Sequence, residues 1–175
     1  MSALASSHTP LVILGSARSD GNTRRLVSQV LTEVPHQLLD LQKLPVAAYR
    51  YTQDYAPDDA FLSIVEQMQR HSVLVFATPV YWYSMSGILK DFFDRLTDLT
   101  EEPHKRLGRG LSGKHVFLLA VGSDPELPEG FEVPFRRTAE YFKMTFEGVL
   151  YQSLKQPFPV EEAQQLVQKI NSAGQ

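Results

Sequence analysis

A polar, glycine-containing segment, GSARSDGNT at residues 15–23, carries residue types that bind phosphate groups. It lies between a short apolar run and a helical pattern, so its amides should form a helix N-terminus, where free N–H groups and the helix dipole favour an anion. Arg18 can pair with a phosphate, and Ser16, Asn22 and Thr23 add hydrogen-bond donors. The spacing fits neither the Walker loop nor the GxGxxG motif. An ordinary turn between a strand and a helix is the alternative interpretation.

A second segment, TPVYWYSMSG at residues 78–87, contains no charged residue and three consecutive aromatic residues, Tyr81, Trp82 and Tyr83. Rings on a rigid loop suit a planar aromatic ligand, and backbone amides beside them can bind ring carbonyl groups. The same rings would also suit a hydrophobic lid or a subunit interface. A third, glycine-led turn begins at Gly122 and Ser123.

Each of these segments follows a predicted strand in a chain where strands and helices alternate. That alternation predicts an α/β protein with a doubly wound, three-layer arrangement around a parallel sheet. Ligands of such sheets bind beyond the carboxyl ends of the strands. The predicted strands are Leu11–Leu14, Gln37–Leu41, Val73–Ala77, His115–Val121 and Thr145–Tyr151. Five helical patterns begin near Asn22, Asp58–Asp59, Gly87, Pro134 and Pro159, and residues 100–113 are predicted to form a solvated loop.

Two groups of charged residues lie outside these segments. Asp91, Asp94 and Arg95 have the i, i+3, i+4 spacing of an ion pair on a solvated or interface helix face. Lys105, Arg106 and Arg109 favour a solvated loop, with attraction of a nucleotide 2′-phosphate as the alternative. The five histidines are scattered without ligand spacing, so no metal site is expected.

Composition limits the chemistry further. The chain has 175 residues, 17 basic and 20 acidic, for a net charge of −3, and no cysteine. Thiolate chemistry is therefore excluded, and redox activity would need a bound cofactor. The charge argues against a nucleic-acid partner, and no segment has the character of a signal peptide or a membrane span. We expect a single cytoplasmic domain over residues 1–175, with flexible termini at 1–8 and 172–175 and no membrane partner.

Three motifs together resemble the NADPH-dependent FMN reductase family of flavodoxin-like proteins. They are GSARSDGNT, TPVYWYSMSGILKDFFDR and LLDLQKLPVAAY, and the similarity extends over residues 9–150. The resemblance implies a five-stranded parallel sheet of order 2-1-3-4-5, non-covalent FMN, NADPH or NADH as donor, and a homodimer or homotetramer. The sequence differs from the family pattern at Tyr83, where family members often have a small residue. Residues 124–135 also match no family pattern.

Carried over by motif position, the resemblance assigns roles to twelve residues. Ser16, Arg18, Asn22 and Thr23 would hold the FMN phosphate, and Gly122 and Ser123 would close one side of the flavin ring. The edge and face of the ring would be lined by Pro79, Val80, Tyr81, Trp82, Tyr83 and Ser84.

The predicted activity is hydride transfer from NAD(P)H through FMN to a flavin, quinone, azo or similar small acceptor by ping-pong exchange. Because the flavin carries the chemistry, no catalytic side chain is expected. A flavodoxin-like electron carrier and a non-catalytic FMN-binding or regulatory module are the alternatives, since a fold does not fix a function.

Overall fold

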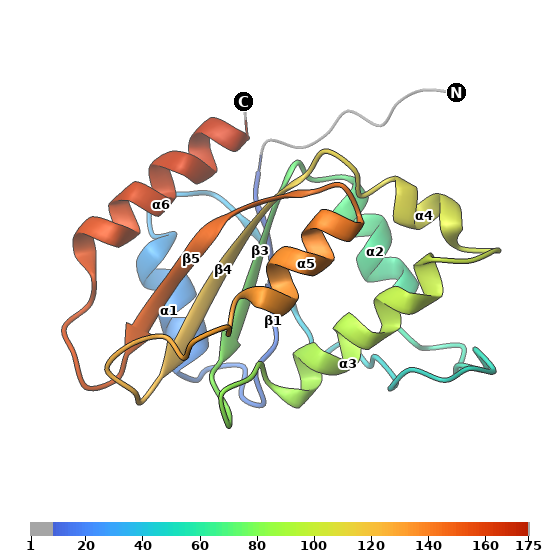
Figure 1. The fold of residues 1–175 in the computed structure, drawn as a ribbon, viewed down its shortest axis with the longest axis horizontal. Helices are drawn as coiled ribbons and strands as arrows, with labels where there is room; N and C mark the ends of the chain where they lie inside the picture. Colours follow the sequence, from blue (N-terminus) through green and yellow to red (C-terminus); the bar gives the residue numbers. More distant parts are fainter. Residues whose placement is uncertain (1–8, 175) are drawn as a thin grey trace.

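A parallel sheet of five strands forms the centre of the protein (Figure 1). The computed structural model describes residues 9–174, so the expectation for residues 1–8 lies outside the described residues. The strand order β2-β1-β3-β4-β5 confirms the order that the family resemblance implies. The strands are β1 (Leu11–Leu14), β2 (Gln37–Asp40), β3 (Val73–Pro79), β4 (His115–Gly122) and β5 (Thr145–Ser153).

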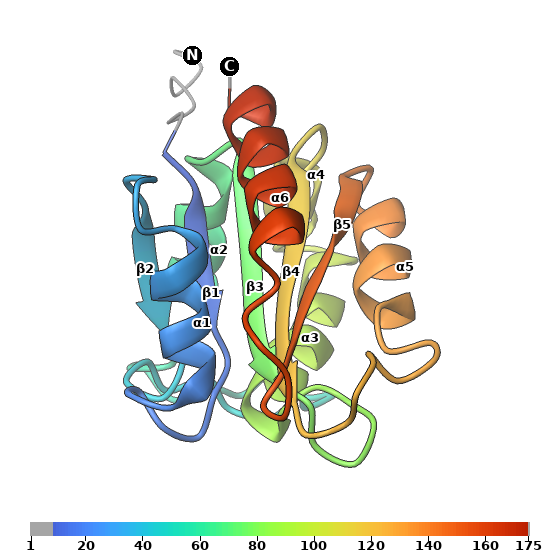
Figure 2. The same cartoon turned by 90° about the vertical axis from the view of Figure 1, so that its left-hand side faces the viewer.

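Helices cover both faces of the sheet, as expected for three layers (Figure 2). They are α1 (Asn22–Val30), α2 (Phe61–Gln69), α3 (Gly87–Arg95), α4 (Lys105–Arg109), α5 (Val133–Tyr141) and α6 (Val160–Ala173), with a 3-10 turn, η1, at Leu96–Leu99. None of these helices is long and apolar enough to cross a membrane.

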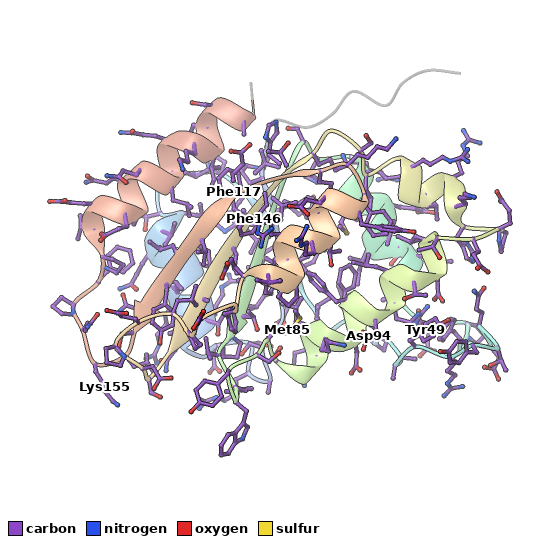
Figure 3. The ribbon with its side chains drawn as sticks, viewed as in Figure 1. Tyr49, Met85, Asp94, Phe117, Phe146 and Lys155 are labelled. Atoms are coloured by element: carbon purple, nitrogen blue, oxygen red, sulfur yellow. The ribbon has the colours of Figure 1, made fainter. Side chains whose placement is uncertain are left out.

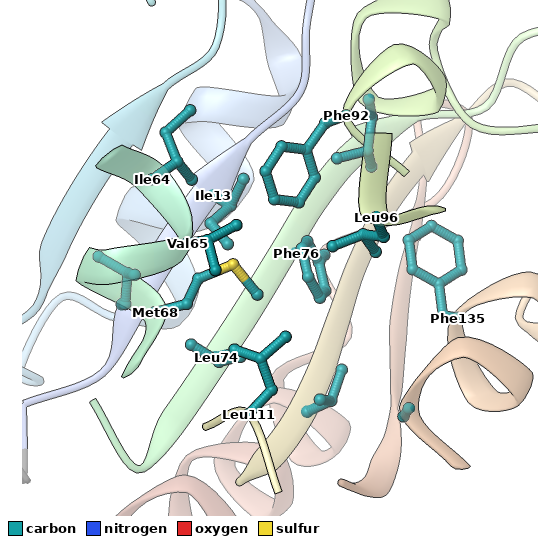
Figure 4. Packing of buried hydrophobic residues seen from close by; sticks show 14 of the residues in the cluster. Ile13, Ile64, Val65, Met68, Leu74, Phe76, Phe92, Leu96, Leu111 and Phe135 are labelled. Carbon is teal, nitrogen blue, oxygen red and sulfur yellow. The ribbon is translucent and has the colours of Figure 1, made fainter. Parts of the chain in front are cut away.

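Alternate residues of the strands supply two separate cores. Ile13 and Phe76 pack with α2, α3 and α5, whereas Val12 and Val75 pack with α1 and α6. Figure 4 shows the first cluster, in which Phe76 lies beside Phe92 of α3. Because β1 and β3 are completely buried, their backbones hold the loops at their carboxyl ends in fixed positions.

One expectation about local structure needs correction. Residues 100–113 are not one solvated loop, because α4 forms within them and Leu111 is fully buried. Leu107 and Leu111, one helical turn apart, supply the apolar face that fixes this segment. At the C-terminus, α6 continues through Ala173, so residues 172 and 173 are helical.

Candidate functional site

The site is at the carboxyl edge of the sheet, between β1 and β3. The chain passes from β1 outward to β2 and then returns across β1 to β3, so the direction of winding reverses at this point. Open α/β sheets bind ligands at such a switch point. In Figure 3, Met85, on the loop after β3, and Lys155, after β5, mark this edge near the bottom of the view.

The amino end of α1 offers free amides on this edge. The first helical hydrogen bond runs from the Arg25 amide to the Gly21 carbonyl oxygen at 3.1 Å, so the amides of residues 21–24 precede the helical ladder. Within residues 9–174 none of these four amides donates a hydrogen bond. Gly21 gives no side-chain cap, and the first turn contains no acidic residue. The amides and the helix dipole are therefore available to an anion.

The loop before α1 adds side chains to these amides. Ser16 is 5% exposed, and its Oγ accepts a hydrogen bond from the Arg18 amide at 3.4 Å. The Arg18 side chain is exposed and lies close to Gly21, since a Cβ atom on Gly21 would be 3.8 Å from Arg18 Nε. Asn22 is half-buried and Thr23 is buried in the first helical turn. A phosphate at the helix N-terminus would thus meet a guanidinium and a hydroxyl as well as backbone amides.

A buried polar bridge joins the loops after β1 and β3. The Ser86 hydroxyl donates to the Gly15 carbonyl oxygen at 2.7 Å, and the Ser86 amide donates to Thr78 Oγ1 at 3.0 Å. Ser86 also caps α3, since its Oγ accepts from the Leu89 amide at 3.2 Å. Gly15 has no room for a side chain, because a Cβ atom there would lie 2.5 Å from Leu89 Cβ. This bridge fixes the spacing between the two loops.

Residues 81–84 form a tight turn at the end of the loop after β3. The Tyr81 and Ser84 backbones exchange two hydrogen bonds, at 2.9 and 3.1 Å, while Trp82 and Tyr83 have φ values of 48° and 64°. Positive φ at both central residues normally requires Asn or Gly, and bulky side chains there store strain, as is common at functional sites. Trp82 is 92% exposed and Tyr83 is 70% exposed. The turn therefore presents two rings outside the packed core.

The loop after β4 closes against the same region. A Cβ atom on Gly122 would lie 2.7 Å from the Tyr151 hydroxyl and 3.2 Å from Val80 Cβ, so only glycine permits this approach. The Tyr151 hydroxyl donates to the Asp124 carbonyl oxygen at 2.9 Å. Burial, followed by the charge of Asp124, raises the pKa of Tyr151 above its ordinary value. The phenol therefore stays protonated at neutral pH and keeps the loop attached to β5.

A cavity of about 610 Å³ lies between the aromatic turn and the segment after β4. Tyr83 forms one side, and Asp124, Glu126 and Glu129 place three carboxyl groups around it with no basic side chain in the lining. Residues 124–135 match no family pattern, and this cavity was therefore not predicted. The sequence signal for it is the pair of prolines at 125 and 128 among acidic residues, because proline restricts the backbone of a loop.

All twelve residues with assigned roles lie on these three loops or on the first or last residues of the adjoining elements. Their contacts with FMN stay predictions. Thr78 and Ser86, which position the loops rather than bind a ligand, were not among the predicted site residues. A serine directly before an apolar helical pattern was the signal for Ser86.

Two charged groups lie away from this site. The basic residues Lys105, Arg106 and Arg109 all belong to α4, which precedes β4 and so lies at the amino edge of the sheet. This is opposite to the position expected for 2′-phosphate recognition. Arg95 was expected in a surface ion pair, but it is 2% exposed. Its ion pairs are with Asp59 at 2.8 Å and Asp98 at 2.7 Å.

Comparisons with known proteins agree with this geometry. The sequence model of the NADPH-dependent FMN reductase family matches residues 10–146. YwqN of Bacillus subtilis strain 168, whose name describes an NAD(P)H-dependent FMN-containing oxidoreductase, is 32% identical over 145 residues, which cover 78% of this chain and 80% of YwqN.

Solved structures share the fold. The Trp repressor binding protein from Bacillus subtilis is 25% identical with a TM-score of 0.69, covering 94% of this chain and 97% of that protein. An FMN-dependent NADH-azoreductase from Bacillus anthracis, solved with FMN, is 10% identical with a TM-score of 0.63, covering 95% of this chain and 97% of that one. The chain thus belongs to the NADPH-dependent FMN reductase family, whose members are FMN-binding, NAD(P)H-dependent oxidoreductases.

Proposed function

We propose that this protein passes hydride from NADPH or NADH, through FMN bound at the switch point between β1 and β3, to a small acceptor such as a flavin, a quinone or an azo compound. The observation that carries the proposal is the free N-terminus of α1, which lies on the same sheet edge as the uncharged aromatic turn at residues 81–84. One suits a phosphate and the other a flat ring, and FMN contains both.

The residues around the proposed site would bind and orient rather than react. Ser16, Arg18 and the amides of residues 21–24 would hold the phosphate. FMN supplies the ring that accepts and releases hydride. Within the described residues the amides of Trp82 and Tyr83 donate no hydrogen bond, so they are free to meet a ring carbonyl group. No carboxylate occurs in residues 78–87 to oppose negative charge on the ring.

The order in which donor and acceptor would bind follows from the single switch point of the sheet. Donor and acceptor would reach the same exposed ring face, so NAD(P)H would leave before the acceptor enters. This predicts ping-pong exchange, which gives parallel lines in double-reciprocal plots of rate against NADPH at several quinone concentrations. Intersecting lines would contradict it. A homodimer or homotetramer in the cytoplasm completes the proposal.

Anaerobic addition of NADPH to the FMN-loaded protein is expected to remove the oxidised flavin absorption band promptly. The reason is that a free flavin face beside an uncharged loop admits the nicotinamide ring. The measurement is a stopped-flow visible spectrum, repeated with NADH to compare the two donors. A bound flavin that stays oxidised with both donors would favour the electron-carrier alternative, and failure to retain FMN would favour the non-catalytic module.

The acidic cavity beside Tyr83 predicts selection among acceptors by charge. Changing Glu126 and Glu129 together to glutamine should raise kcat/KM for an anionic, sulfonated quinone about five- to tenfold at low salt, because two repulsive charges are lost. A neutral quinone should be reduced at an unchanged rate.

The matched control changes Glu101 and Glu102, at the opposite edge of the sheet, to glutamine, which alters the net charge equally. This control should leave both acceptors unaffected. An equal gain in the two double variants would mean that overall charge, and not the cavity, selects the acceptor.

A further inference from the structure

A second cavity, of about 420 Å³, lies at the amino edge of the sheet. Its lining comes from α4, from the C-terminal end of α5 and the two residues after it, and from Leu99, Thr100 and Ser112. In Figure 1, α4 and the end of α5 lie at the end of the sheet where β4 and β5 begin. The proposed FMN site is at the carboxyl ends of the strands, so this cavity and that site are at opposite ends of the sheet and share no residue.

Three positive side chains line this second cavity without a countercharge. Lys105, Arg109 and Lys143 belong to its lining, which contains no acidic residue. None of the three forms an ion pair or a side-chain hydrogen bond within residues 9–174. The basic residues of α5 itself behave differently, since Arg136 and Arg137 both pair with Glu140, at 3.3 and 2.9 Å. Three unpaired cations around one hollow favour an anion.

The three basic side chains are not needed as hydrogen-bond donors for the last carbonyl groups of α5. The Thr138, Ala139 and Glu140 carbonyl oxygens already accept backbone hydrogen bonds from residues 142–144, at 2.8 to 3.2 Å. Lys143 has a left-handed backbone, with φ of 58°, and its own carbonyl oxygen accepts from the Gly113 amide at 2.8 Å. The lysine is therefore held at the rim of the cavity by its backbone, and its ammonium group stays available.

Aromatic and apolar groups form the rest of the cavity wall. Tyr141 is 66% exposed and packs edge-on against the buried Phe142 ring, with 5.1 Å between the ring centroids. A Cβ atom on Gly108 would lie 2.6 Å from the Leu99 carbonyl oxygen, so α4 packs here by its bare backbone. An exposed ring over an apolar floor suits a flat ligand.

We infer that this cavity binds a small planar aromatic anion, a ring that carries a phosphate, sulfonate or carboxylate group, as a second ligand distinct from those of the FMN site. The three cations would neutralise the anionic group, and Tyr141 with Phe142 would contact the ring.

Residue-resolved NMR of the FMN-loaded protein, freed of excess FMN, tests this inference with 1-naphthyl phosphate as the probe. Saturable shifts are expected for the amides of Gly108, Ser112 and Tyr141, while the amide of Asn22 should not move. Changing Lys105 and Arg109 together to glutamine should weaken binding at least about tenfold, because two charge-assisted contacts are lost. Both side chains are exposed, so the fold should persist.

The matched control changes Arg136 and Arg137 to glutamine, an equal change in net charge on neighbouring surface, and should bind the probe as the unmodified protein does. Equal weakening in both double variants would overturn the inference, since it would show attraction by overall charge alone. Absence of saturable shifts at millimolar probe would also overturn it. Inorganic phosphate or uncharged 1-naphthol binding as tightly as the probe would do the same, because one of the two parts of the ligand would then contribute nothing.

Discussion

Changing Asn22 to aspartate is expected to weaken FMN binding by roughly two orders of magnitude, while the protein stays as stable as before or becomes slightly more stable. The new carboxylate would stand in the first turn of α1, which has no acidic residue. FMN's phosphate is mostly a dianion above pH 6, and like charges a few ångströms apart at a protein surface cost about 2–4 kcal/mol. The same carboxylate interacts favourably with the helix dipole, by about 0.3–1 kcal/mol. Binding and folding should therefore change in opposite directions.

Affinity is measured by the quenching of FMN fluorescence on titration, and stability by thermal unfolding of the FMN-free protein. Asn171→Asp is the control, because Asn171 is exposed on α6 and undergoes the same chemical change. It should leave the FMN affinity unaltered. The loss at Asn22 should also shrink below pH 6, where the phosphate becomes a monoanion. Unchanged affinity in Asn22→Asp would place the phosphate elsewhere and remove the proposed site.

The sequence was sufficient for the position of the three site loops because each loop follows a strand that ends in at least four consecutive apolar residues. The predicted strand at Val73–Ala77 extends to Pro79 in the structure, and the one at Thr145–Tyr151 extends to Ser153. Parallel alternation places all carboxyl ends on one edge. The strand order, in contrast, depends on pairing between distant segments, and only the family resemblance supplied it.

Other features of the site could not be predicted from the residue pattern. The left-handed backbone at Trp82 and Tyr83 contradicts the preference of aromatic residues, so it follows from the surrounding packing and not from local sequence. The bond from Ser86 to Gly15 joins residues 71 positions apart. Such contacts become visible only when β1 and β3 are placed side by side.

Arg95 shows most clearly how local spacing can mislead. Its nearest acidic residues on the predicted helix were Asp91 and Asp94, and the expected pair was therefore local. The structure instead pairs it with Asp98 and with Asp59, which is 36 positions away. The guanidinium carbon also lies 3.3 Å from the centroid of the Tyr55 ring. This buried cluster attaches the long segment before α2 to the end of α3.

Changing Arg95 to glutamine is expected to lower the free energy of unfolding at pH 7 by about 3–5 kcal/mol, because removal of one partner leaves buried carboxylates without a countercharge. Asp59 and Asp98 are 7% and 2% exposed in their side chains, so water does not replace the lost guanidinium. The measurement is urea denaturation of the FMN-free protein. Lys90→Gln, on the same helix, breaks the half-exposed pair with Asp94 and should cost no more than about 0.5 kcal/mol.

The pH dependence of this loss distinguishes an electrostatic role from simple packing. Burial by itself raises the pKa of Asp59, but hydrogen bonds from Arg95 and from the Ala47 and Phe61 amides outweigh it and lower that pKa below 3.8. In the unmodified protein Asp59 thus contributes stability above pH 3.8, which is lost as the pH falls through the lowered pKa. Without Arg95 the largest contribution that offsets burial is lost, so the pKa of Asp59 should rise in the variant. Protonation of Asp59 should then remove the uncompensated buried charge as the pH falls from 7 toward 4. The difference in the free energy of unfolding between the two proteins should accordingly be largest at neutral pH and smaller near pH 4.5. A difference that is constant with pH would mean that Arg95 stabilises the fold through its packing on Tyr55 and Phe61.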